Sequence, residues 1–119
     1  DHELEMDFVM IPAPTKEKGG APYFPFIFII VDPNEGMIID FEIMSPQPDF
    51  DSMLSSLPET ILGKIIQTDE RPGVISYKSP YIEGIMKWIK KETGQEMEQR
   101  LDLPVLEDAV EHLIDSLNQ

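Results

Sequence analysis

The pattern of hydrophobic and polar positions over the first 44 residues predicts three β-strands. Apolar and acidic residues alternate from Leu4 to Met10, which is the period of a strand with one face in water. Residues 23–31 form an almost uninterrupted apolar run, typical of a buried strand, and turn-forming residues at 32–36 separate it from residues 37–44. Two acids alternate with apolar residues in this third stretch, so we expect an edge strand with outward carboxylates.

Helical and strand patterns alternate after residue 44. We expect the first helix to end before Pro58, because proline in a helix interior removes a hydrogen bond and clashes with the preceding turn. Ser79 and Pro80 suit a helix start, and Gly94 suits the end of the same helix. The predicted elements are a short helix capped by Asp49 or Asp51, a strand at 61–68, a helix at 80–93, a strand at 95–101 and a last helix that starts at Pro104.

The element order β-β-β-α-β-α-β-α predicts a mixed α/β fold around one sheet. Strands joined through helices run parallel and cross over right-handed, whereas a tight turn joins antiparallel strands. The order therefore predicts a five-stranded mixed sheet in which the first three strands are antiparallel. This arrangement resembles the ribonuclease H-like fold, and within it the retroviral-type integrases and transposases.

Three acids stand where this resemblance places metal ligands. Residues 7–12 resemble the first catalytic strand of those enzymes, and residues 68–73, predicted to follow the fourth strand, resemble their second acidic motif. The resemblance implies that Asp7, Asp69 and Glu107 converge, with Glu107 38 residues after Asp69 on the last helix. Three carboxylates would hold Mg²⁺ or Mn²⁺ and assist a displacement at phosphorus. The chain has 23 acids, however, so some of them match such positions by chance.

A second resemblance covers most of the chain at the level of short motifs. These motifs are Phe24-Pro25-Phe26, the hairpin residues 31–38, the prolines at 46 and 48, and residues 103–109. From about Tyr23 to the C-terminus they resemble an uncharacterised prokaryotic domain family without an established activity. The hairpin has Glu35 where that family commonly has threonine. This resemblance implies a fold and a domain boundary more than a mechanism.

The charge balance indicates which kinds of partner the chain can bind. Nine Lys and Arg residues against 23 Asp and Glu residues give a formal net charge of −14, which repels phosphate backbones. We therefore expect no duplex nucleic acid partner, and a protein partner would be basic. Lys87, Lys90 and Lys91 suit the last turn of a helix, where cations offset the helix dipole.

Length and composition predict one domain over residues 1–119. A chain of this size buries enough surface for a single core. The longest apolar run, Phe26 to Val31, is too short to span a bilayer, so we expect no membrane insertion and a cytoplasmic location. The chain begins with Asp1 rather than methionine, which indicates processing or excision from a longer protein. The oligomeric state is not predicted.

These observations favour a non-enzymatic accessory or protein-interaction domain, without an assigned catalytic residue, metal or cofactor. The alternative is a phosphoryl-transfer enzyme of the nuclease or transposase type, which would use Asp7, Asp69 and Glu107 with Mg²⁺ or Mn²⁺. The two interpretations differ in whether the three carboxylates lie close together.

Overall fold

One mixed sheet organises the part of the chain that the computed structural model describes, residues 2–15, 19–68 and 71–117. The strand order is β3-β2-β1-β4-β5. β1 (Glu3–Met10), β2 (Phe26–Asp32) and β3 (Met37–Met44) are antiparallel neighbours, and β4 (Val74–Tyr77) and β5 (Met97–Gln99) run parallel to β1. The predicted element order and the five-stranded mixed sheet are confirmed.

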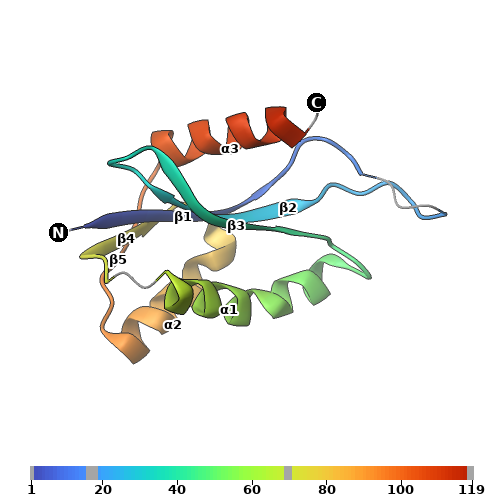
Figure 1. Cartoon of the computed structure of the whole chain (residues 1–119). Helices are drawn as coiled ribbons and strands as arrows, with labels where there is room; N and C mark the ends of the chain where they lie inside the picture. Colours follow the sequence, from blue (N-terminus) through green and yellow to red (C-terminus); the bar gives the residue numbers. More distant parts are fainter. Residues whose placement is uncertain (1, 16–18, 69–70, 118–119) are drawn as a thin grey trace.

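Helices cover both faces of the sheet (Figure 1). α1 (Phe50–Gln67) and α2 (Glu83–Thr93) lie against one face, with the short 3₁₀ helix η1 (Pro80–Ile82) before α2, and α3 (Pro104–Leu117) lies against the other face. The larger apolar core therefore lies between the sheet and the helix pair, and a smaller core lies under α3. Within the described ranges, no helix is long and apolar enough to cross a membrane.

α1 is longer than the sequence pattern predicts. Pro58 lies inside this helix, and residues 61–68, predicted to be the fourth strand, form its second half and its C-cap. Met53, Leu57 and Ile61 follow one another at four-residue intervals and are all buried against the sheet. Packing of this face offsets the backbone hydrogen bond that Pro58 cannot make. The predicted helix end and the predicted strand at 61–68 are therefore wrong, and the fourth strand is β4.

β1 lies at the centre of the sheet, between β2 and β4. The prediction that one face of this strand is in water is wrong, because Glu5 and Asp7 are only 4% and 2% exposed. Leu4 and Met6 belong to the core under α1 and α2, so the alternate residues Glu5 and Asp7 face α3. The alternation of acidic and apolar residues here marks two buried faces, one of which is polar.

β1 extends beyond its neighbour β4. β4 pairs with residues Glu3 to Glu5 of β1, whereas β2 pairs with residues Glu5 to Met10. After Tyr77 the chain leaves the sheet toward η1, and no described strand lies on that side of Phe8–Met10. We call Phe8–Met10 the open half of β1.

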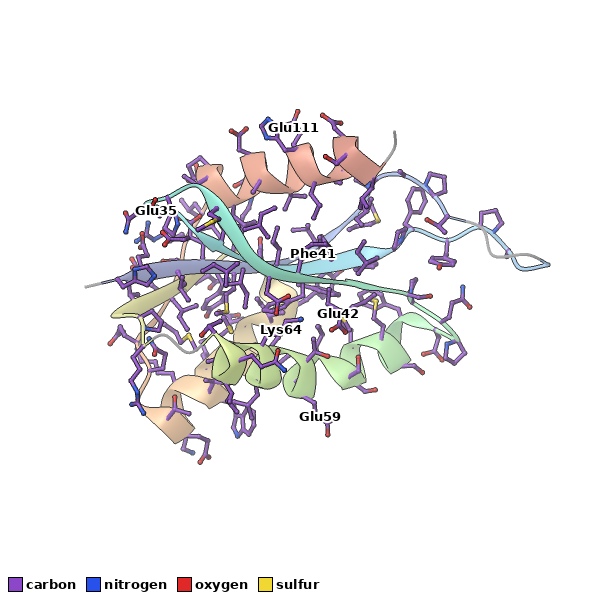
Figure 2. All side chains as sticks on the ribbon, viewed as in Figure 1. Glu35, Phe41, Glu42, Glu59, Lys64 and Glu111 are labelled. Atoms are coloured by element: carbon purple, nitrogen blue, oxygen red, sulfur yellow. The ribbon has the colours of Figure 1, made fainter. Side chains whose placement is uncertain are left out.

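β3 is an edge strand, as predicted, but its two acids contact α1. Lys64 Nζ lies 3.1 Å from Asp40 Oδ2 and 3.7 Å from Glu42 Oε1. Figure 2 shows Lys64 and Glu42 in the space between β3 and α1. Partly exposed pairs of this kind contribute little to stability.

Candidate functional site

A hollow of about 800 Å³ lies beside the open half of β1. This half-strand, the loop after β4 and one side of α3 enclose it. Its apolar walls include Phe8 and Phe26 from the sheet, Tyr81 from η1, and Val110 and Ile114 from α3. A concave, mostly apolar site of this size with a few polar groups is typical of a ligand-binding site. We call this hollow the β1 cleft.

Asp7 contributes a buried carboxyl group to the β1 cleft. Its Oδ1 accepts a hydrogen bond from the backbone N–H of Ser79 at 2.8 Å. Burial raises the pKa of the Asp7 carboxyl above its ordinary value, and the hydrogen bonds from the Ser79 and Phe8 amides act in the opposite direction. The loop after β4 is thus tied to β1 through this side chain.

Lys78, not an acid, follows the fourth strand. Its Nζ lies 3.6 Å from Oε2 of Glu107 on α3, and both residues line the β1 cleft. The same Glu107 oxygen accepts a hydrogen bond from the Leu103 backbone N–H at 2.7 Å, which satisfies an amide at the start of α3. Asp69, predicted for the end of the fourth strand, lies outside the described residues and precedes β4 in the sequence.

Within the described residues, the carboxylates of the β1 cleft are not arranged as a set of divalent-metal ligands. Mg²⁺ and Mn²⁺ need several oxygen ligands, but Asp7 and Glu107 each already accept a backbone amide, and Lys78 brings a positive charge to Glu107. In the described part of the chain, no three acidic or histidine side chains are grouped so that they could hold a metal. The structure therefore brings Asp7 and Glu107 into one cleft, with a cation beside them.

An aromatic cluster forms one wall of the β1 cleft. The rings of Phe8 and Phe26 stack with centroids 5.0 Å apart, and Tyr81 meets Phe8 edge-on at 6.4 Å. Phe50 of α1 contacts both Phe26 and Tyr81, at 5.4 Å and 5.3 Å. Tyr81 remains 55% exposed, so part of its side chain is accessible from the solvent. The sequence gives no signal for this cluster, because the four rings come from four separate elements.

The α3 side of the β1 cleft is acidic. Glu107, Glu111 and Asp115 occur at four-residue intervals on α3, and all three line the cleft. Figure 2 shows Glu111 on this helix, and both Glu111 and Asp115 are exposed. Of the described residues that line the cleft, four carry carboxyl groups and Lys78 is the one that carries a positive charge.

The sequence matches one protein family over residues 1–114. That family is described as a domain of unknown function, DUF6930. The chain belongs to this family. The resemblance predicted from about Tyr23 onward is confirmed, and the match extends it to include β1 and Asp7. Comparison with curated protein sequences gave no match.

Among solved structures, this chain is similar to the catalytic core domain of BIV integrase. The two share a TM-score of 0.60 at 16% sequence identity, over 96% of this chain and 67% of that chain. At this level of identity the likeness shows the fold alone. It confirms the ribonuclease H-like architecture that the element order predicts.

Proposed function

We propose that this chain is a non-enzymatic accessory domain that binds a protein partner through the β1 cleft. The observation that carries this proposal is the position of Lys78, directly after the fourth strand. A metal-dependent phosphoryl-transfer site of this fold would need a further carboxylate there, whereas the Lys78 ammonium pairs with Glu107. The apolar walls of the cleft still suit the binding of a ligand.

The distribution of charge supports a protein partner rather than a nucleic acid. The net charge of −14 opposes the phosphate field. Two lysines of α2 are also compensated locally, since Lys87 lies 3.4 Å from Glu83 and Lys90 lies 2.9 Å from Glu96. We further propose that the protein partner is basic, that the chain is located in the cytoplasm and that it acts without a bound cofactor.

A metal-binding and nuclease assay on the whole chain tests the proposal. Labelled duplex and single-stranded DNA are incubated with Mg²⁺ or Mn²⁺ at near-physiological salt, with wild type, Asp7→Asn and Asp69→Asn. We expect no cleavage above background and no rise in Tm with Mn²⁺, because two carboxylates beside an ammonium bind such ions weakly.

The same assay addresses the alternative function. Metal-dependent cleavage by wild type that is lost in both Asp7→Asn and Asp69→Asn would contradict the proposal. It would support a phosphoryl-transfer enzyme that uses Asp7, Asp69 and Glu107 with Mg²⁺ or Mn²⁺. Asp108→Asn is the matched control, since Asp108 is an exposed acid of α3 that does not line the β1 cleft.

A further inference from the structure

We propose that the β1 cleft binds an extended apolar peptide that carries a basic side chain, and that this peptide pairs with the open half of β1. The inference deepens the proposed function and rests on it. It depends on three features of the same place: an unpaired strand edge, apolar walls on both sides of that edge, and an acidic rim.

The direction of the backbone groups identifies the free edge. The Ile11 N–H donates to the Pro25 carbonyl at 2.8 Å, so this residue faces the β2 side of β1. Alternate residues of a strand direct their backbone groups to opposite sides, so Phe8 and Met10 face away from β2. The Phe8 amide interacts with the Asp7 carboxylate. The Phe8 carbonyl and both backbone groups of Met10 therefore lie along the cleft side, where no described strand covers them.

Unpaired strand edges accept an added strand, because its backbone completes their hydrogen bonds. This favours a peptide over a compact small molecule as the occupant. An added strand would direct its side chains alternately to the two sides of the sheet. One side offers Val110 and Ile114 of α3, and the other offers Phe8 and Tyr81. Both sets of side chains of the bound peptide would therefore be apolar along the cleft.

Charge sets the remaining feature of the ligand. Glu107, Glu111 and Asp115 line the α3 side of the cleft, and Lys78 already pairs with the first of them. Glu111 and Asp115 are exposed and would attract a lysine or arginine at the rim of the site. The chain's net charge of −14 adds to the same preference.

A displayed library of random heptapeptides, selected on the whole chain, is the probe for this ligand. We expect the enriched peptides to be largely apolar and to carry one lysine or arginine. Methylation of alternate peptide amides should abolish binding in one register and spare it in the other, because only every second N–H of a strand faces its neighbour. This readout leaves the protein itself unchanged.

Protein variants locate the binding site. Met10→Pro removes one amide donor from the open edge without removing a hydrogen bond to β2, and should weaken binding about tenfold. The double variant Glu111→Lys/Asp115→Lys should bind the basic peptides at least about tenfold more weakly than wild type does. It should instead bind versions in which glutamate replaces the basic residue. Asp108→Lys, on the same helix but outside the cleft, is the matched control and should bind as wild type does.

Several outcomes would overturn the inference. These are no enrichment, enrichment of acidic peptides, equal binding by the double charge variant, or insensitivity to amide methylation. Self-association of the chain that Met10→Pro abolishes would also overturn it, since a second copy would then be the occupant. None of these results produces metal-dependent cleavage, so failure of the peptide inference is distinguishable from failure of the non-enzymatic proposal.

Discussion

The two halves of β1 have the same neighbour on one side and different surroundings on the other. Residues Glu3 to Glu5, the enclosed half, pair with β4, and Glu5 also pairs with β2. Phe8–Met10 has β2 on one side and the β1 cleft on the other. A buried acid that faces α3 accompanies each half: Glu5 lies in the enclosed half, and Asp7 lies directly before the open half. The comparison separates a carboxyl group that contacts α3 from one that lines the β1 cleft.

Glu5 serves the fold. Its Oε1 accepts a hydrogen bond from the Leu106 backbone N–H at 3.3 Å, within the first turn of α3, where unpaired amides favour a carboxylate. Asp7 instead accepts from the Ser79 amide in the loop after β4, and it lines the cleft that this loop helps to form. Glu5 and Asp7 are only two residues apart on β1, yet their carboxyl groups have different contacts. The reason is that β4 ends between the levels of these two residues.

The largest difference between the two halves should appear in stability. Leu4→Ala removes a fully buried side chain from the enclosed half and should lower the free energy of unfolding by about 2–5 kcal/mol. Met10→Ala removes a similar volume from the open half, where the side chain is 48% exposed, and should cost less than about 1 kcal/mol. Urea unfolding of both variants measures the difference. Equal losses would mean that the open half is packed as tightly as the enclosed one.

The sequence predicts the topology of this fold better than its element boundaries. The order of elements and the turn at 32–36 are enough to indicate a mixed sheet, because crossover rules leave few alternatives. Pro58 leads to a wrong prediction of the helix end. The rule against proline in helices considers only neighbouring residues, whereas the stability of α1 also depends on the sheet against which its buried face packs. The wrong position of the fourth strand has the same cause. Once the helix is predicted to end before Pro58, residues 61–68 have to be assigned to another element.

The candidate site was only partly predictable for the same reason. The resemblance to integrases and transposases implied Asp7 and Glu107 as site residues, and both line the β1 cleft. Lys78 was missed, since its position after the fourth strand is apparent only when β4 is placed correctly. The burial of Glu5 was also missed, because acidic alternation in a sequence does not distinguish a wet face from a face covered by a helix end.

The two buried acids should make stability fall as pH rises. Burial raises the pKa of both Glu5 and Asp7, so the folded state holds their protons in a pH range where the unfolded chain has released them. The free energy of unfolding should therefore decrease from about pH 4 upward through the raised values. Glu5→Gln and Asp7→Asn should each flatten this decrease, as measured by urea unfolding from pH 4 to 7.

Asp49 provides a control of opposite sign for this measurement. The Ser52 backbone N–H lowers the pKa of the Asp49 carboxyl at the N-cap of α1, so its contribution is present above the ordinary pKa and lost as pH falls. Asp49→Asn should reduce the acid loss instead, in urea unfolding extended below about pH 4, because a carboxyl with a lowered pKa titrates below its ordinary value. If Asp7→Asn changed the pH profile in the same direction as Asp49→Asn, the Asp7 carboxyl would be stabilised in its charged form, as expected for a cation-binding ligand.

The smallest effect should come from Lys78, although the proposed function rests on the position of this residue. Its pair with Glu107 is 3.6 Å long and about half exposed, so Lys78→Met should change the free energy of unfolding by less than about 1 kcal/mol. Lys87→Met is the matched control, because Lys87 pairs with Glu83 on α2, away from the cleft. Both changes in the free energy of unfolding should become smaller in high salt, which screens exposed charges.

Only Lys78→Met should also alter binding in the cleft. It should raise the affinity for a basic peptide, since it removes the positive charge that competes for Glu107. A loss of several kcal/mol in Lys78→Met would instead mean that the ammonium is a structural substitute for a metal ion, and that the cleft is closed around it.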